Sequence, residues 1–503
     1  MLLRRIRITA AALCFVFISL LFLDLTGISH RYLGWLARLQ LIPAILALNG
    51  VVIIGILAVT LLLGRVYCSV ICPLGVFQDI FSWYAGKWMK RRFAYSPARN
   101  LIRFLFLAVF SSSIVLGLSS VFVLYEPYSV YGRIISNLFT LPFKLLNNFA
   151  ALLADHLDSY AVYSSDIWIK SSVTLFVAAV SFLVIAVLAW RKGRIYCNTL
   201  CPVGTVLGIF SRFSFFKPVV DPDKCNRCGM CSGNCKASCI DHENHAIDAS
   251  RCVMCMDCIC VCSRKAISFI PHYRKKRTET PAVTHLSDKK KNTGRSTRSA
   301  FLSIISMFAF AASARAASQK IEGGLAVLKD RKIPDRKAPL SPAGSQGGDH
   351  LSKHCTSCGL CITACPNQVL RPHPGISRLM QPEMSYERGY CRPECTECSR
   401  VCPTGAIRPI SKADKSVTQI GHAVWIRKNC VVLTDHVSCG NCARHCPAGA
   451  IHMVPTDFNN PDSPQIPAVD TEHCIGCGAC EYLCPSRPFP AIYVEGHERH
   501  KIV

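Results

Sequence analysis

Cysteines dominate the chemistry that this sequence could perform. The 503-residue chain holds 31 of them, and most fall in tight runs, many ending in Cys-Pro. Disulfide scaffolds are also rich in cysteine, but those are short secreted chains. Each of six runs contains four cysteines, of which three are closely spaced. That pattern suits [4Fe-4S] clusters better than zinc, because zinc sites usually pair two CxxC halves across a longer gap. The sequence therefore predicts six [4Fe-4S] clusters.

The first two runs share the spacing C-x2-C-x2-C-x3-C. In such a run the first three thiolates bind one cluster and the fourth crosses to the other. Neither run has the usual proline after its last cysteine, because Lys236 and Ser263 stand there. Cys239 is a spare thiol that could replace Cys235 as the crossing ligand, and Cys260 is also spare. The predicted ligands are Cys225, Cys228, Cys231, Cys235, Cys252, Cys255, Cys258 and Cys262.

Four further runs occupy the C-terminal third, and each ends in Cys-Pro. The second has three residues between its first two cysteines and the third has eight, so His436 could replace Cys430 in the third. Short strands are expected after the Cys-Pro steps, at 405–407 and 449–451. The predicted ligands are Cys355, Cys358, Cys361, Cys365, Cys391, Cys395, Cys398, Cys402, Cys430, Cys439, Cys442, Cys446, Cys474, Cys477, Cys480 and Cys484.

A second kind of cysteine motif occurs twice in the N-terminal half. The segment GRVYCSVICPLG at 64–75 recurs as GRIYCNTLCPVG at 193–204. If these segments are helical, the x3 spacing puts both sulfurs of a pair on one face. The two pairs are expected to converge and either ligate one metal cluster or cycle as redox thiols. Simple packing of small buried cysteines is the alternative. The candidate reactive residues are Cys68, Cys72, Cys197 and Cys201.

Four apolar runs must position these motifs. They cover roughly 8–25, 41–63, 101–124 and 173–190, and each is about long enough to cross ~30 Å of hydrocarbon. Basic residues flank alternate ends, which by the positive-inside rule places those flanks in the cytoplasm. Arg194 is one of these flanking charges. The first run could instead be a signal peptide, but the pairing of basic flanks favours an anchor.

A fifth apolar stretch at 300–314 follows a strongly basic segment. Such charge ahead of an apolar helix holds the cytoplasmic side of a span, and the small residues after it are typical of export signals. We expect the stretch to span or to direct export, which would place the C-terminal clusters outside. A short helix on the inner surface, with all six clusters cytoplasmic, is the alternative.

Composition excludes several classes of function. The formal net charge is +26, but an oxidised cluster with four thiolates carries roughly −2, so six would offset about half of it. The remaining basic surplus lies in the predicted cytoplasmic loops, and nothing supports nucleic-acid binding. The chain has no CxxCH sequence for covalent haem and no glycine-rich fingerprint for a flavin or nicotinamide.

These motifs resemble two known families. The four spans, the paired CxxxCP loops and the first two cluster runs, over about 1–270, resemble the NapH-type membrane ferredoxins and related NosR-like domains. Residues 295–490, with a degenerate export motif and four cluster runs, resemble the NapG and MauM polyferredoxins. The resemblance implies a fusion of partners that are usually separate chains, serving quinol oxidation and electron delivery.

The fold class predicted is an α-helical membrane domain of four spans plus a fifth, joined to α+β ferredoxin-like domains. The expected units are a membrane domain at 1–215, a two-cluster domain at 216–270, linkers at 271–298 and 318–350 around a fifth span or export segment at 299–317, and a four-cluster domain at 351–503.

The predicted function is electron transfer in the cytoplasmic membrane, as part of a quinol dehydrogenase-type complex. Quinol would supply the electrons, and a terminal reductase outside would receive them. Glu126, Tyr128 and Arg133, at the outer end of the third run, could line a quinol pocket, although such residues also anchor helices. One alternative is a membrane reductase that acts on a metal or a disulfide through the CxxxCP thiols. A redox sensor or scaffold is another.

Overall fold

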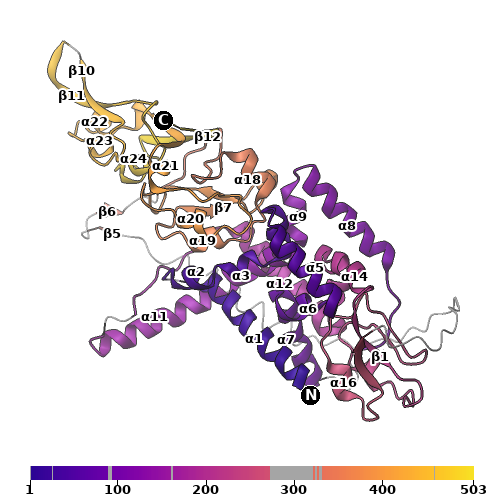
Figure 1. The fold of residues 1–503 in the computed structure, drawn as a ribbon. Helices are drawn as coiled ribbons and strands as arrows, with labels where there is room; N and C mark the ends of the chain where they lie inside the picture. Colours follow the sequence, from indigo (N-terminus) through magenta and orange to yellow (C-terminus); the bar gives the residue numbers. More distant parts are fainter. Residues whose placement is uncertain are drawn as a thin grey trace.

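The computed structural model describes residues 2–24, 26–88, 93–159, 162–271, 321–322, 326–327, 331–457 and 459–502. The basic segment beyond residue 271, the apolar stretch 300–314 and the export-like motif lie outside these described residues. Figure 1 shows a helical domain that lies between two smaller cysteine-rich domains.

The helical domain comprises every described element up to residue 211. Its elements are α1 (Leu2–Leu23), α2 (Ile28–Leu33), α3 (Trp35–Arg38), α4 (Leu41–Leu46), α5 (Gly50–Leu63), α6 (Val66–Val70), α7 (Pro73–Trp88), α8 (Asn100–Val115), α9 (Ser119–Tyr125), α10 (Pro127–Ile134), the π-helix η1 (Ile135–Phe139), α11 (Thr140–His156), α12 (Ser172–Lys192), α13 (Ile195–Thr199) and α14 (Pro202–Ser211).

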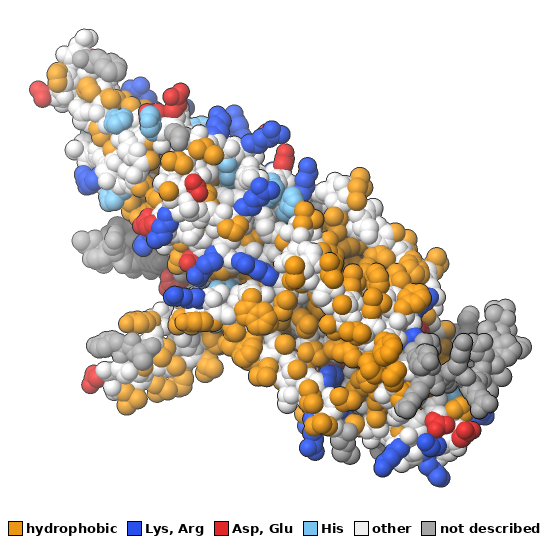
Figure 2. Space-filling view, in the orientation of Figure 1, with side chains coloured by type: hydrophobic (Ala, Val, Ile, Leu, Met, Phe, Trp, Pro, Cys, Tyr) orange, Lys and Arg blue, Asp and Glu red, His pale blue; other side chains and the backbone are white. Residues whose placement is uncertain are grey.

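Two of the described helices are long and apolar enough to cross a bilayer. These are α1, with 22 residues, and α12, with 21 residues. The apolar helices α5 and α8 are shorter, with 14 and 16 residues. Figure 2 shows hydrophobic side chains spread over this part of the molecule, while charged side chains gather on the domains at both ends.

The second and third predicted spans are broken helices, which is why only two uninterrupted spans are found. In the second, α4 ends before a turn in which Leu48 has a φ of 53°, and the Asn49 side chain then accepts a hydrogen bond from the Val52 amide and caps α5. In the third, α8 ends before Gly117, which has a φ of 70°. A left-handed residue cannot continue a right-handed helix, so each apolar run bends where it occurs.

The two-cluster domain follows α14. Its outer strands, β1 (Phe216–Val220) and β4 (Ile267–Pro271), pair antiparallel, with Val220 opposite Ile267. The inner strands β2 (Ile240–Asp241) and β3 (Ala246–Ile247) form a second pair, and the short helices α15 (Met230–Gly233) and α16 (Asp257–Val261) each belong to one cysteine run. Strands this short cannot bury a large core, so the cysteine loops make up much of the interior.

The four-cluster domain consists of two units, the first with the cysteine runs 355–365 and 391–402 and the second with the runs 430–446 and 474–484. The strands β5 (Ile321–Glu322) and β6 (Ala326–Val327) lie in the predicted linker before it, and α18 (Gly348–His354) leads into it. Its further elements are α19 (Leu360–Thr363), β7 (Leu370–Pro372), η3 (Ile376–Arg378), β8 (Pro382–Met384), α20 (Glu397–Val401), α21 (Lys412–Ser416), β9 (Thr418–Trp425), η4 (Arg427–Asn429), α22 (Val431–Thr434), α23 (Asn441–Arg444), β10 (Ile451–Asp457), β11 (Asn460–Val469), α24 (Ala479–Leu483) and β12 (Ile492–Ile502). Strand β9 precedes the cysteine runs of the second unit and β12 follows them, and the two strands pair antiparallel.

The strand predicted at 449–451 is only partly confirmed, because β10 begins at Ile451 and continues to Asp457. The strand predicted at 405–407 is wrong, since that segment forms a bend with Gly405 at a φ of 73°. The Ile407 amide there donates a hydrogen bond to the Cys402 sulfur instead of to a neighbouring strand.

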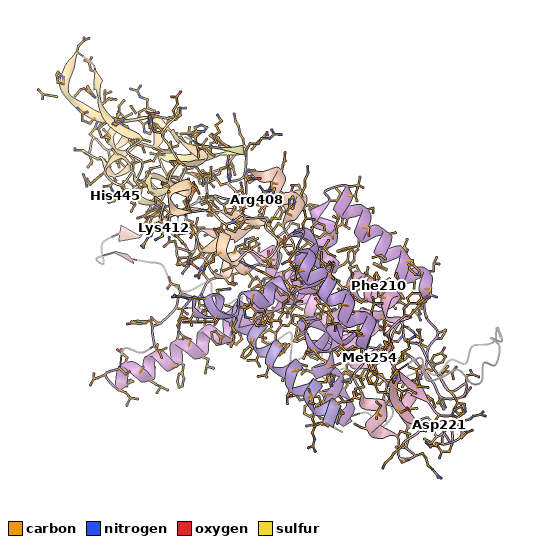
Figure 3. The ribbon with its side chains drawn as sticks, in the orientation of Figure 1. Phe210, Asp221, Met254, Arg408, Lys412 and His445 are labelled. Atoms are coloured by element: carbon orange, nitrogen blue, oxygen red, sulfur yellow. The ribbon has the colours of Figure 1, made fainter. Side chains whose placement is uncertain are left out.

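The two cysteine-rich domains contact opposite ends of α1. Near the start of the helix, the Arg4 guanidinium binds the Asp257 carboxylate of the two-cluster domain at 2.7 Å. Near its end, the Phe22 ring packs against Gly132, which in turn approaches the Cys358 carbonyl of the four-cluster domain. Arg4 and Phe22 are separated by about 27 Å of helix at 1.5 Å per residue. Figure 3 shows Asp221 and Met254 at one end of the molecule, with Arg408 and His445 toward the other.

Candidate functional site: a series of cysteine clusters

The two CxxxCP segments form matching loops. Each begins after a glycine with positive φ, Gly64 at 75° and Gly193 at 60°, and continues into a one-turn helix, α6 or α13. The proline that follows the second cysteine starts the next helix, α7 or α14, because proline suits the first helical position. In the second loop the Cys201 sulfur accepts a hydrogen bond from the Gly204 amide at 3.4 Å and so caps α14.

The structure brings the four CxxxCP cysteines together around two buried arginines. The Arg65 guanidinium lies 3.8 Å from the Cys68 sulfur and donates to the Cys197 carbonyl at 3.2 Å. Arg194 makes the reciprocal contact, donating to the Cys68 carbonyl. Both arginine side chains are fully buried. Each repeat therefore holds the cysteine loop of the other.

Glycine is required at two positions beside these arginine side chains, because the backbone approaches a neighbouring carbonyl closely there. A Cβ atom on Gly75 would lie 2.3 Å from the Cys68 carbonyl oxygen, and one on Gly204 would lie 2.0 Å from the Cys197 carbonyl oxygen. The matched Gly-Arg and Cys-Pro-x-Gly pieces of the two repeats thus have a packing role. In the sequence Arg194 stands out only as a flanking positive charge, and the duplicated Gly-Arg is the signal that could have identified its role.

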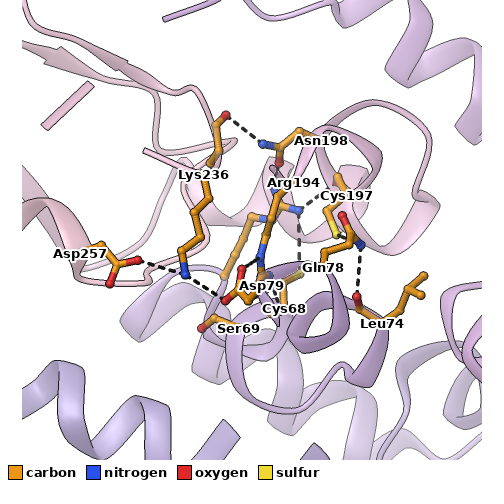
Figure 4. A network of polar contacts seen from close by, with 12 residues as sticks. Cys68, Ser69, Leu74, Gln78, Asp79, Arg194, Cys197, Asn198, Lys236 and Asp257 are labelled. Carbon is orange, nitrogen blue, oxygen red and sulfur yellow. Dashed lines mark hydrogen bonds and ion pairs between the residues drawn. The ribbon is translucent and has the colours of Figure 1, made fainter. Parts of the chain in front are cut away.

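The two halves differ where α7 faces the site. Gln78 of α7 donates to the Cys197 sulfur at 3.3 Å. Its neighbour Asp79 binds Arg194 at 2.8 Å, Lys236 at 3.2 Å and Arg7 at 3.6 Å. In α14 the corresponding positions are Leu207 and Gly208, so the second repeat has no such acid. Figure 4 shows this network.

The Asp79 network also joins the CxxxCP site to the two-cluster domain. Lys236 bridges Asp79 and Asp257, binding the latter at 3.0 Å. Lys236 is the residue that replaces the proline usual after the last cysteine of such a run, so this departure has a structural consequence. Asn198, next to Cys197, donates to the Ala237 carbonyl at 3.1 Å.

Two cysteine groups lie inside the two-cluster domain. One pocket is lined by Cys225, Cys228, Cys231 and Cys262. The other is lined by Cys235, Cys239, Cys252, Cys255 and Cys258. The last cysteine of the second run therefore lies with the first three of the first run, as crossing requires. Both Cys235 and Cys239 reach the other pocket, and their sulfurs are 3.6 Å apart.

Four of the six runs share one backbone device. The residue before the second cysteine has a positive φ, as at Arg227, Met254, Ser357 and Gly476. The residue after that cysteine is also left-handed, as at Gly229, Met256, Gly359 and Gly478. Such alternation turns successive amides toward the inside of a loop, where they form an anion-binding concavity. This geometry suits a [4Fe-4S] cluster, which is anionic when held by four thiolates.

Backbone amides also point at individual sulfurs. Cys355 accepts from Ser357 at 3.3 Å, Cys262 from Ala266 at 3.2 Å, Cys474 from Ala423 at 3.4 Å and Cys484 from Ala491 at 3.2 Å. Hydrogen bonds to ligand sulfurs stabilise the negative charge and adjust the reduction potential of a bound cluster.

In the four-cluster domain, cysteines of each run lie close enough to the fourth cysteine of the neighbouring run to be repelled by it. Burial, with repulsion from Cys402, raises the pKa of the Cys355 thiol to about 12. Burial also raises the pKa of Cys391, to which Cys365 and Cys395 contribute repulsion. Cys402 thus lies with the first run and Cys365 with the second.

The second unit follows the same rule. One pocket is lined by Cys446, Cys474, Cys477 and Cys480. Burial, with repulsion from Cys439 and Cys484, raises the pKa of the Cys442 thiol to about 11, which places those three cysteines together. The remaining member of that run, Cys430, is buried, whereas His436 is exposed.

The two units meet through their cysteine loops. The Cys391 amide donates to the Cys477 carbonyl at 3.0 Å. The buried Tyr386 hydroxyl donates to the Gly476 carbonyl at 2.6 Å. A cysteine loop of the first unit therefore contacts a cysteine loop of the second directly through the backbone, and the Tyr390 and Tyr482 rings lie 6.1 Å apart beside them.

Glu126, Tyr128 and Arg133 are buried beside the four-cluster domain. The Glu126 carboxylate caps α10 by accepting from the Tyr128 and Ser129 amides, and all three candidate side chains are buried. Arg133 donates to the Val123 carbonyl at 3.1 Å and lies 3.5 Å from the Met380 sulfur of the four-cluster domain. These residues form the surface on which that domain sits.

Within the described residues, no three His, Cys, Asp or Glu side chains lie close enough to hold one metal ion.

Comparison with known proteins gives the family. A 4Fe-4S binding domain matches residues 46–94 and 174–219, and a 4Fe-4S dicluster domain matches 354–406 and 437–487. The chain belongs to the ferredoxin-type 4Fe-4S proteins, a class of iron-sulfur electron carriers. The first match covers both CxxxCP loops, and the second covers all four C-terminal runs except Cys430.

The relatives match different parts of the chain. The methylamine utilization ferredoxin-type protein MauM of Methylobacillus flagellatus is 32% identical over 32% of this chain and 70% of its own length. The ferredoxin-type protein NapH of Escherichia coli is 27% identical over 44% of this chain and 67% of its own length. An uncharacterised protein of Methanocaldococcus jannaschii is 39% identical, but this chain spans only 33% of its length. No solved structure matches.

Proposed function

We propose that the protein is a membrane-anchored electron conduit. It takes electrons from quinol and delivers them, through clusters in series, to a reductase on the far side of the membrane. The observation that carries this proposal is spatial: the two cysteine-rich domains contact opposite ends of α1, one at Arg4 and the other beside Phe22. Clusters bound in this series supply one-electron transfer with little rearrangement.

Six clusters are proposed, each with a crossing ligand. In every neighbouring pair of runs, three cysteines of one run combine with the fourth cysteine of the other. The proposed sets are Cys225, Cys228, Cys231 and Cys262; Cys252, Cys255, Cys258 and either Cys235 or Cys239; Cys355, Cys358, Cys361 and Cys402; Cys391, Cys395, Cys398 and Cys365; Cys430, Cys439, Cys442 and Cys484; Cys474, Cys477, Cys480 and Cys446.

The CxxxCP site is proposed as the connection between the two ends. On one side, Asn198 reaches the Ala237 carbonyl beside the two-cluster domain. On the other, the Tyr196 hydroxyl donates to the Tyr125 carbonyl at 2.8 Å, next to Glu126. From there α10 leads to the four-cluster domain, where the Ser129 hydroxyl lies 3.4 Å from the Ser357 carbonyl.

Burial argues against the CxxxCP thiols as a substrate-reducing centre. The four cysteines are between 4% and 6% exposed. A disulfide or a metal complex in solution could not reach their sulfurs without a rearrangement of both repeats, whereas electron transfer needs no such access. We therefore favour relay over reduction of an external metal or disulfide. For Glu126, Tyr128 and Arg133 we propose a docking role, because Arg133 lies 3.5 Å from the Met380 sulfur and Ser129 of the same helix lies 3.4 Å from the Ser357 carbonyl.

The test uses the full chain, purified anaerobically and placed in phospholipid vesicles. It should contain about 24 iron atoms from the six sets, and a reduced quinone should bleach their visible absorption. Cys197→Ser should slow reduction of the clusters on one side of the CxxxCP site by at least tenfold. Cys14→Ser is the matched control, because Cys14 lies on α1 outside every run.

Stoichiometric zinc with little iron would exclude the cluster assignment. No bleaching by quinol in vesicles that contain intact clusters would exclude the quinol branch. A reporter fused after residue 503 decides the topology: a cytoplasmic signal would overturn delivery to the far side.

A further inference from the structure

Helix α11 has an exposed apolar face that the electron-transfer role does not explain. None of its 17 residues is buried. Leu145, Leu146, Phe149, Leu152 and Leu153 are 55%, 67%, 58%, 57% and 48% exposed. Their spacing of three, four and seven residues places them on one side of the helix. In Figure 2 hydrophobic side chains also cover this projecting arm.

The opposite side of α11 is polar and already has partners. Lys144 donates to the Asp166 carbonyl at 2.7 Å, and Asn147 donates to the Tyr163 carbonyl at 2.8 Å. Asn148 exchanges hydrogen bonds with Ser165. Residues 163–166 thus form a strap along this face. The apolar face is the one left uncovered among the described residues.

The strap continues directly to the four-cluster domain. The Trp168 indole donates to the Gln368 side chain at 2.7 Å, and Lys170 donates to the Ile362 carbonyl at 3.1 Å. The Trp168 ring also lies beneath two guanidinium groups, those of Arg371 at 4.6 Å and Arg388 at 4.7 Å. Whatever holds α11 in place therefore also positions this domain.

The direction of α11 indicates what covers it. The helix leaves the bundle through η1, which packs against α1 and α12, the two helices long enough to span a bilayer. Figure 1 shows α11 running across α1 and away from it, near the end of α1 that faces the four-cluster domain. Helix α1 also exposes apolar side chains in its second half, among them Val16 and Leu20.

We propose that α11 lies in the headgroup and acyl-chain boundary of the bilayer, with its leucine and phenylalanine face toward the hydrocarbon. Together with the strap it fixes the height and orientation of the four-cluster domain above the membrane. Amphipathic helices of this kind bind interfaces through buried apolar area. Helix α11 carries one lysine, Lys144, and one aspartate, Asp155, so these two charges cancel. Its binding therefore does not need anionic lipid. This inference rests on the proposed membrane anchoring.

The experiment places a tryptophan on that face. Phe149→Trp is compared with Phe489→Trp, which is 42% exposed on the four-cluster domain and serves as the matched control. Both full-length variants, with clusters, are reconstituted in phosphatidylcholine nanodiscs, and the emission of the unsubstituted protein is subtracted. We expect doxyl-labelled phosphatidylcholine to quench the added tryptophan of Phe149→Trp at least threefold more than that of Phe489→Trp. Iodide in the buffer should show the reverse order.

Equal quenching of the two variants by labelled lipid would overturn the proposal. Protection of Phe149→Trp from both lipid and iodide, with two chains in each disc, would also overturn it and identify a second copy as the occupant. Alkaline carbonate extraction separates this result from failure of the anchoring itself. A chain that stays in the membrane while Phe149→Trp remains in water refutes only the role of α11, and a chain that is extracted refutes the membrane-anchored conduit.

Discussion

Substitution of Asp79 tests whether the Asp79–Arg194 ion pair stabilises the two CxxxCP loops. The Asp79 carboxylate lies 2.8 Å from the Arg194 guanidinium, and that arginine side chain is fully buried. At an effective dielectric constant of about 20, one pair at this distance attracts by about 6 kcal/mol before desolvation is subtracted. Removing one partner of a buried pair typically costs about 3–5 kcal/mol, because the other charge stays buried without compensation.

Asp79→Asn keeps the shape of the side chain and removes its charge. Arg194 then loses its main counter-charge and should hold the Cys68 carbonyl less firmly. At 1.4 kcal/mol per factor of ten, a loss of about 3–5 kcal/mol increases local opening by about 100- to 4,000-fold, up to the limit set by global unfolding.

The assay is hydrogen–deuterium exchange of the full chain in detergent, followed by mass spectrometry. Amides of α6 and α13 should exchange about two to three orders of magnitude faster in Asp79→Asn, while those of β9 and β12 should not change. Glu397→Gln is the control, because the Glu397 pair with Arg400 is half exposed and worth at most about 1 kcal/mol. Exchange of α6 and α13 within threefold of the unsubstituted rate would refute the reasoning.

Three further outcomes are expected. In electron paramagnetic resonance spectra, Cys402→Ser should change the signal of the cluster held by the run 355–361, and Cys365→Ser should change that of the cluster held by the run 391–398. If each fourth cysteine instead binds the cluster of its own run, each substitution will change the other signal. Tyr386→Phe should lower the thermal stability of the four-cluster domain by about 1–3 kcal/mol, because the Gly476 carbonyl loses its buried donor; an unchanged melting temperature contradicts this. Burial, with repulsion from His497, lowers the pKa of His500 to about 4. As the pH falls from 6.5 to 4, the unfolded chain therefore takes up a proton at this position before the folded chain does, and the free energy of unfolding should fall by up to about 3 kcal/mol. In His500→Gln that part of the acid sensitivity should disappear from melts recorded across this range.

The sequence alone was enough to predict the kind of cofactor. Ligand spacing is a local property, since one short loop can wrap a cluster whatever surrounds it, and the family comparison supports [4Fe-4S] chemistry. The duplicated CxxxCP segment was visible for the same reason. Apolar runs were equally clear, but composition could not show that Leu48 and Gly117 break two of them, because a left-handed residue leaves little trace in an average over twenty positions.

Only the tertiary structure decided how the sites are connected. The reciprocal hold of Arg65 and Arg194 depends on two segments that are 129 residues apart, and no local pattern shows that one guanidinium will reach the other loop. Lys236 is a second example. In the sequence it is only the residue that replaces an expected proline, whereas in the fold its ammonium group bridges Asp79 and Asp257. Long-range pairing follows from how whole elements pack, and packing depends on the shape and burial of many side chains at once. Local chemistry is therefore encoded in the cysteine runs, and the order in which those runs meet is a property of the folded chain.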